Sequence, residues 1–315
     1  MLFNFCKIVE GVEQSIICNL QKEKIKFIPN EMIVVINMLN NQPFHEVKEF
    51  FQDDLDIFDS YIDFLLEEKF AFFSETNSHF IEIEDYWASP EFINNAILEY
   101  DFKAYDIVNV LDQLGELLTK HIEFRLTNFD ESNIEKLKEI IDHCTNSVVR
   151  SIRIYYPFHS KELSKRIMDE FNLYSIIECN IVYSNNINKT IEKNNSTTRF
   201  ISQTLYEITT ANIDRKYLIN NIRYFYECQK FNPYYNKKVS IDRLGNIKNC
   251  IKNRAVFGNV NNDELSNIIS TKDFQEFWEV THDKIIDIKD SELRYNYIIT
   301  NDLEKLDEGF YKILN

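Results

Sequence analysis

Glycine and proline are both scarce in this chain of 315 residues, which contains five of each. The glycines lie far apart, so no glycine-rich loop is available to wrap a phosphate group. The sequence also lacks GxGxxG, GxxxxGK(S/T), GxSxG and HExxH motifs, which leaves nucleotide-binding, acyl-transfer and zinc-protease functions without local support. So few turn-forming residues predict long regular elements joined by short polar loops.

The six cysteines show no spacing typical of a local metal site. No CxxC or CxxxCxxC occurs, and the closest pair, Cys6 and Cys18, is twelve residues apart. In a reducing compartment we expect most of them to be small buried apolar side chains. We therefore predict no metal site and no cofactor. The alternative, that Cys179, Cys228 and Cys250 converge with a histidine on a metal, stays open because spacing alone does not test it.

Positive charge is in deficit, and the formal net charge is −16. A surface this acidic does not attract a phosphate backbone, so we expect no nucleic-acid partner. One small basic cluster, Lys22, Lys24 and Lys26, is interpreted as the solvated face of a hairpin. No apolar run approaches the roughly 18 residues of a membrane helix, and the first ten residues do not resemble a signal peptide. We therefore expect a cytoplasmic protein without a membrane partner.

The hydrophobic content of 44% is enough to build cores in two or three compact units. We predict an α/β fold with three domains, over residues 1–88, 89–232 and 233–315. The first pattern is that of a winged-helix unit, in which Ser15–Leu20 and Lys24–Ile28 form a hairpin. The later predicted elements of this unit are helices over Glu31–Leu39, from Pro43, and along an apolar stripe from Leu55 to Leu66, and wing strands at Phe70–Phe73 and His79–Ile83.

The middle domain alternates strands and helices roughly every 25–30 residues, which indicates βαβ units around a parallel sheet. The predicted strands are His121–Leu126, Ser151–Pro157 and Ser175–Tyr183, followed by a polar loop at Asn185–Asn195 and an extended run at Thr197–Tyr206. The predicted helices are Tyr105–Lys120, Asn133–Cys144 and Lys161–Phe171. Three or four such units make a partial barrel or a small open sheet.

The last domain carries the most specific pattern of the chain. Strands Asn236–Asp242 and Asn246–Cys250 are predicted to pair around a turn, and a helix bearing Phe274, Phe277, Trp278 and Val280 follows. The stretch from Asn232 to Cys250, followed by Phe257-Gly258-Asn259-Val260, resembles the SPASM region of the grasp-with-spasm peptide maturases. Two further blocks, Ser15–Gln21 with Ile28-Pro29-Asn30 and then Trp87–Ile97, match the same family in the expected order.

This resemblance implies a three-part system for the maturation of a ribosomally made, graspetide-like peptide. Its parts are a short precursor peptide, an ATP-grasp ligase that crosslinks it, and this companion protein. The first domain would then be similar to the recognition domains that capture leader peptides. The middle would be a reduced radical-SAM-like barrel, and the last domain a degenerate SPASM-like region.

The chain departs from the family where the ligands of an iron–sulfur cluster belong. The family has the form Cys-Lys-Asp-Cys-Glu-Phe-Arg-Tyr-x-Cys, and residues 288–297 read Ile-Lys-Asp-Ser-Glu-Leu-Arg-Tyr-Asn-Tyr. Ile288, Ser291 and Tyr297 therefore stand at the thiolate positions, and neither an alkyl group nor a neutral hydroxyl replaces a thiolate at iron. With no radical-SAM CxxxCxxC either, we predict that cluster chemistry is lost and that the protein has no catalytic residues of its own.

Peptide binding is predicted for the first domain. An exposed edge strand at Lys24–Ile28 accepts an extended peptide through backbone hydrogen bonds, while the third helix beside it supplies an apolar surface. The predicted contact residues are Lys24, Lys26, Phe27, Ile28, Tyr61 and Leu65. The alternative is that Phe27, Tyr61 and Leu65 are simply core residues.

Three other groups each have two interpretations. The four aspartates between 53 and 59 either favour the positive end of the third helix dipole or attract a basic leader peptide. The carboxylates Glu82, Glu84 and Asp85 either form a solvated strand face or reach one metal. The neighbours His143-Cys144 suggest a catalytic dyad, but adjacent residues on a helix diverge by about 100°, which disfavours the needed hydrogen bond.

We predict a noncatalytic adaptor that binds a precursor peptide and presents it to an ATP-grasp ligase, which raises the effective concentration of the peptide at the ligase. One alternative is a peptide-modifying metalloenzyme whose site is assembled from distant Cys and His residues. Another is a purely structural protein that scaffolds the ligase without contacting the peptide.

Overall fold

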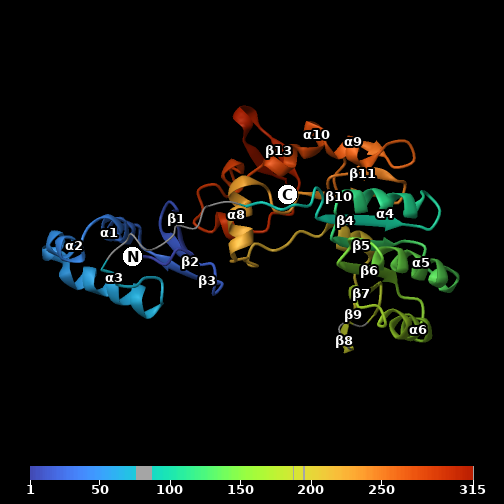
Figure 1. The fold of residues 1–315 in the computed structure, drawn as a ribbon, viewed down its shortest axis with the longest axis horizontal. Coiled ribbons are helices and arrows are strands. Elements are labelled where there is room, and N and C mark those ends of the chain that lie inside the picture. Colours follow the sequence, from blue (N-terminus) through green and yellow to red (C-terminus); the bar gives the residue numbers. More distant parts are fainter. Residues whose placement is uncertain (76–86, 187, 194–195, 315) are drawn as a thin grey trace. The chain divides into compact units, whose positions relative to one another are not determined.

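The structure is a computed structural model that describes residues 1–75, 87–186, 188–193 and 196–314. The protein is of mixed α/β type and forms two compact units (Figure 1). The first comprises Met1–Trp87, Ile213–Pro233 and Val280–Asn315, and the second comprises Ala88–Asn212 and Tyr234–Glu279. No helix of the described residues is long and apolar enough to cross a membrane.

The first unit begins with a small antiparallel sheet in the order β1 (Cys6–Val9), β2 (Ser15–Asn19) and β3 (Lys24–Ile28). The predicted hairpin is confirmed, because Ser15 pairs with Ile28 and Asn19 pairs with Lys24. Its polar turn contains Glu23 at a φ of 54°, in the left-handed region that tight turns use. In the part of the chain described, β3 is an edge strand of this sheet.

Three helices follow, α1 (Asn30–Asn41), α2 (Phe44–Phe50) and α3 (Leu55–Glu67), as the sequence predicts. The first two begin directly after Pro29 and Pro43, whose fixed backbone angle suits a helix start. The face of the sheet with Ile17 and Ile28 packs on α1 and α3. The opposite face, with Ile16 and Cys18, packs on Phe225 and Tyr226 of α8 (Ile222–Lys230). Both faces of β2 are therefore buried, whereas β3 at the edge is covered only in part.

The predicted wing has a different outcome. Phe70–Phe73 forms only an isolated bridge, between Ala71 and Leu2, supported by a hydrogen bond from the Phe3 amide to the Phe70 carbonyl. The second predicted wing strand, His79–Ile83, lies outside the described residues, as do Glu82, Glu84 and Asp85. The remaining regular strands of this unit form a hairpin of β13 (Leu303–Lys305) and β14 (Tyr311–Ile313).

The second unit is built on a sheet with the order β12-β11-β10-β4-β5-β6-β7-β9-β8. Its central strands are β4 (Asn95–Tyr100), β5 (His121–Leu126), β6 (Ser151–Pro157) and β7 (Ile177–Tyr183), which pair in parallel. The connecting helices are α4 (Ile107–Glu116), α5 (Ile134–Thr145) and α6 (Lys161–Phe171). The predicted βαβ units are thus confirmed, because each of these helices connects two neighbouring parallel strands.

The end of the parallel sheet differs from the prediction. The expected polar loop contains β8 (Lys189–Lys193), which pairs antiparallel with β9 (Ser196–Phe200). The extended run predicted to continue to Tyr206 instead ends at Phe200. α7 (Leu205–Thr210) starts after Thr204, which forms a capping box with Glu207. An edge strand needs little apolar content, so the polar sequence of β8 gave no strand signal.

The hairpin predicted in the last domain is confirmed as β10 (Lys238–Ile241) and β11 (Asn246–Lys248), with β12 (Gly258–Asn259) beside it. Asp242 stabilises the turn, because its carboxylate accepts hydrogen bonds from the amides of Leu244 and Asn246. β10 also pairs in parallel with β4, with Lys238 opposite Asn95. Residues 234–279 consequently belong to the same compact unit as residues 88–212, whereas the sequence analysis places them in separate domains.

The other short elements complete the two units. The segment predicted as one helix around Phe274 is divided between a short α-helix and a 3-10 turn. The short elements are α9 (Leu265–Ile269), α10 (Lys272–Gln275), η1 (Gln52–Asp54), η2 (Glu131–Asn133), η3 (Glu276–Glu279), η4 (His282–Lys284), η5 (Arg294–Asn296) and η6 (Asp307–Gly309).

Candidate peptide-binding surface

The two lysines predicted to contact a peptide lie on the face of β3 that points toward α3. Lys24 and Lys26 both form ion pairs with Glu68, which caps the end of that helix, and the Lys26 Nζ lies 3.0 Å from its carboxylate. Each lysine side chain keeps about 40% of its surface exposed. The pairing holds the open edge of β3 beside the end of α3.

The other four predicted residues differ in how exposed they are. On β3 the side chains alternate between the two faces of the sheet, and on α3 those of the apolar stripe face the core. Phe27 points away from the lysines and is 52% exposed, whereas Ile28 is buried in the core with α1. Leu65 is buried in that core as well, and Tyr61 is half-buried against it. Contact between a peptide and these residues stays a prediction, with Phe27 and the two lysines the most accessible of the six.

The outer edge of β3 is partly capped. At its turn end, the side-chain amide of Asn220 donates a hydrogen bond of 2.8 Å to the Lys24 carbonyl. No further strand pairs with residues 25–28 on that side within the part of the chain that the structure describes. The backbone groups of an edge strand are a ready template for an added strand.

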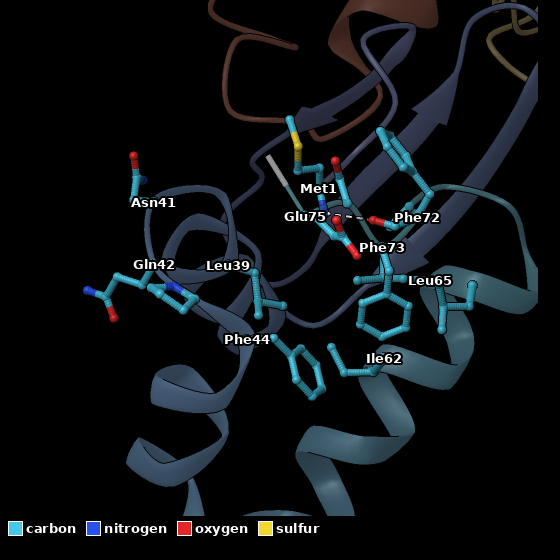
Figure 2. Close-up of a pocket in the computed structure, with 14 residues that line it drawn as sticks. Met1, Leu39, Asn41, Gln42, Phe44, Ile62, Leu65, Phe72, Phe73 and Glu75 are labelled. Atoms are coloured by element: carbon cyan, nitrogen blue, oxygen red, sulfur yellow. Dashed lines mark hydrogen bonds between the residues drawn. The ribbon is translucent and has the colours of Figure 1, made fainter. Parts of the chain in front are cut away.

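A pocket of about 470 Å³ lies on another side of the same helix (Figure 2). It is bounded by the end of α1 and the turn into α2, by α3, and by the segment at 71–75. Its lining residues are Met1, Leu39, Asn41, Gln42, Pro43, Phe44, Ile62, Leu65, Leu66, Ala71, Phe72, Phe73, Ser74 and Glu75. Leu65 is the one lining residue that the sequence analysis also selected as a peptide contact.

Aromatic rings form much of the pocket wall. Figure 2 shows the side chains of Leu39, Phe44, Ile62 and Phe73 directed toward one another. The rings of Phe44 and Phe73 meet edge to face with centroids 5.3 Å apart, although Phe73 remains 64% exposed. The aromatic run at 70–73 is the sequence signal that this site offers, but only the fold shows that it faces the start of α2.

Ile288, Ser291 and Tyr297, the positions predicted to correspond to cluster ligands, all lie in the first unit. Ile288 is buried, and its carbonyl accepts a hydrogen bond of 2.9 Å from the Ser291 amide. The Ser291 and Tyr297 hydroxyls lie 3.4 Å apart, within reach of each other. An alkyl side chain and two neutral hydroxyls do not fit an iron–sulfur cluster, which takes thiolates.

Comparison with known proteins gives the chain no family. No protein-family model matches it, and no curated protein does. Similar solved structures include Streptococcus suis SuiB bound to S-adenosylmethionine, at 12% identity and a TM-score of 0.24, covering 87% of this chain and 88% of that chain.

Two further SuiB structures give similar values. One is 10% identical, with a TM-score of 0.27, and covers 87% of this chain and 89% of that chain. SuiB bound to the precursor peptide SuiA is 12% identical, with a TM-score of 0.24 and coverage of 85% and 88%. TM-scores this far below 0.5 do not establish a common fold, so no property of SuiB is transferred to this chain.

Within the described residues, no group of three or more His, Cys, Asp or Glu side chains is placed to hold a metal. All six cysteines are buried, and burial raises the pKa of Cys144 to about 12, which keeps it a thiol. His143 instead bonds through Nε2 to Asp112 at 2.8 Å. The Tyr234 hydroxyl lies 3.3 Å from the Cys250 sulfur.

Proposed function

We propose that this protein is a noncatalytic adaptor that binds a short ribosomally made peptide and presents it to a modifying enzyme. The observation that carries the proposal is the outer edge of β3: β2 pairs with one side of residues 25–28, and no strand of the described residues pairs with the other side. Phe27 lies on this strand and is 52% exposed, which gives an extended peptide an aromatic surface beside the backbone groups.

The finer part of the proposal concerns the system to which the protein belongs. The hairpin of β10 and β11, with the residues that follow it, carries the sequence pattern that resembles grasp-with-spasm maturases. We propose that the partner enzyme is an ATP-grasp ligase, that the first unit acts as a winged-helix leader-recognition domain, and that the region around Ser291 is a degenerate SPASM domain. Linking peptide capture to a docked ligase raises the local concentration of the peptide.

The edge of β3 alone supplies only part of the binding free energy that a peptide complex needs. Net backbone hydrogen bonds contribute about 1 kcal/mol each, so a four-residue match contributes about 4 kcal/mol before the cost of ordering the peptide. A micromolar complex needs about 8 kcal/mol. Buried apolar side chains, at about 1.5–3 kcal/mol each, must therefore supply much of the affinity.

The test is a tagged pull-down of the full chain at native expression, read by mass spectrometry for short peptides and for large partners. Phe27→Ala removes the exposed aromatic ring on β3, and Leu173→Ala is the matched control because Leu173 is an 82% exposed apolar side chain of the second unit. We expect the native chain and L173A to recover a short peptide, with a ligase, and F27A to recover less peptide.

Two results would contradict the proposal. Recovery of a ligase without any short peptide would favour a scaffold that does not contact the substrate. Recovery of neither partner would remove the adaptor function, and stoichiometric iron in anaerobically purified protein would then favour an enzyme.

A further inference from the structure

The pocket beside α3 is large enough to take a bulky side chain. Its volume of about 470 Å³ lies within the roughly 300–1,000 Å³ typical of ligand pockets. Leu39, Phe44, Ile62 and Leu66 give it an apolar wall, and none of these four side chains is fully buried. A site of this kind takes a bulky aliphatic or aromatic group.

The surface next to this pocket is strongly acidic. Residues 44–75 contain ten carboxylates and only two lysines. Asp56, Asp59, Asp63 and Glu67 recur at intervals of three or four residues, so they form one stripe along α3. At about 100° per residue this stripe lies immediately beside Ile62 and Leu66, the residues that line the pocket.

Most of these carboxylates have no internal counter-charge. Asp59 pairs with Lys48 at 2.7 Å. Asp56, Asp63 and Glu67 are exposed and form no ion pair within the described residues, and the same holds for Glu75 in the pocket lining. Carboxylates this close together repel one another, so a cation placed over them is favoured.

An apolar side chain also remains exposed at the pocket itself. Phe73, which lines it, is 64% exposed. Exposed apolar surface of this kind, bordered by charge, marks interaction sites. A second copy of this chain is a poor occupant, because its own net charge is −16.

We propose that the pocket receives a bulky apolar side chain of a peptide, and that lysine or arginine residues beside this anchor pair with Asp56, Asp63 and Glu67. The inference rests on the proposed peptide-binding function and adds the chemical class of the peptide, a cationic segment with an aromatic or large aliphatic anchor. The edge of β3 recognises backbone and accepts many sequences, whereas this pocket selects among them.

Fluorescence anisotropy on the full chain tests the proposal with three labelled twelve-residue probes. The first has a central phenylalanine flanked by four lysines, the second has glutamates in place of the lysines, and the third has alanine in place of the phenylalanine. We expect the first probe to bind at least about tenfold more tightly than either control, and to weaken as salt rises from about 50 to 500 mM.

Variants distinguish binding at the pocket from a general attraction between the acidic protein and a cationic probe. The triple variant D56N/D63N/E67Q should weaken the cationic probe about tenfold, because each exposed pair contributes modestly. Phe73→Ala should weaken it as well. The control E116Q/E139Q/E162Q removes the same charge from exposed positions of the second unit and should change binding less than about twofold.

The outcomes distinguish this inference from the proposed function. Equal binding of the lysine and glutamate probes, or no effect of D56N/D63N/E67Q, would overturn the assignment of the pocket. If a peptide recovered from the host binds that variant normally but is lost on Phe27→Ala, the adaptor function stands and the pocket assignment fails. Concentration-dependent dimerisation that is abolished by Phe73→Ala, without probe binding, would instead make this surface a self-interface and would also overturn it.

Discussion

A single buried histidine should make the first unit sensitive to mild acid. His282 is fully buried, and its Nδ1 lies 2.6 Å from the Arg294 carbonyl. A carbonyl only accepts hydrogen bonds, so Nδ1 carries the proton and Nε2 holds the lone pair. Nε2 is buried without a hydrogen-bond partner among the described residues. Burial lowers the pKa of His282 from 6.5 to about 4, because a second proton would place an uncompensated charge there.

The sign and size of the effect follow from linkage. Between pH 6.5 and about 4 the unfolded chain binds this proton and the folded chain does not. The contribution of the neutral histidine is therefore fully present above pH 6.5 and is lost as the pH falls toward 4. A difference of about 2.5 pKa units corresponds to roughly 3 kcal/mol, a large share of the 5–15 kcal/mol that stabilises a typical domain.

The contribution of His282 to the free energy of unfolding is measured by urea unfolding between pH 7 and pH 4, followed by circular dichroism. The native protein is compared with the variant His282→Gln. Glutamine keeps a donor for the Arg294 carbonyl and does not titrate. The carboxylates titrate alike in both proteins, so the difference in unfolding free energy isolates the histidine. We expect the native advantage over H282Q to shrink by about 3 kcal/mol over this range. A difference that stays constant to within about 0.5 kcal/mol would refute the buried neutral state.

Three further outcomes follow from side-chain packing, from backbone geometry and from the lack of a metal-binding cluster among the described residues. Phe58→Ala should lower the unfolding free energy by about 3–5 kcal/mol in a urea titration, since Phe58 is 1% exposed between Phe44 and Phe51. Gly245→Ala should cost about 1–2 kcal/mol, because Gly245 has a φ of +82°, whereas Gly115→Ala on α4 meets no neighbour within 4 Å and should be neutral or slightly stabilising. Chelator treatment should leave the melting temperature unchanged, and a fall of several degrees would show that a metal stabilises the fold.

The elements that sequence reasoning recovered best are those with strong local signals. The bounds of β5, β6 and α6 agree with their predicted ranges, because buried apolar strands and an amphipathic helix each carry their own periodicity. β4 was missed, although Ala96, Leu98 and Tyr100 are buried on one of its faces. Its register depends on β5 on one side and β10 on the other, and β10 lies far along the chain.

In the candidate site, too, the features set by neighbouring residues were predicted, and those set by tertiary packing were not. The sequence predicted the edge strand at β3, because alternation and a charged turn define it within a few residues. For Leu65 it left two interpretations open, and the structure favours the core; it did not reveal that Ile28 faces the core too, since that depends on how α1 and α3 pack on the sheet. The pocket was missed for the same reason, as its wall joins the start of α2 to the segment at 71–75.

The segment at 288–297 is held in the first unit by hydrogen bonds of its own polar side chains. In small regions that bind a metal through thiolates, the metal contributes folding free energy, so a segment without thiolates depends on other contacts. Here Arg294 bonds both to the Asp283 carboxylate at 3.0 Å and to the Glu10 carbonyl at 2.7 Å. The fully buried Asn296 donates to the Ile219 carbonyl at 2.9 Å. These bonds tie the segment to the β1–β2 region and to the residues before α8, so the architecture of the first unit needs no thiolate at Ile288 or Ser291.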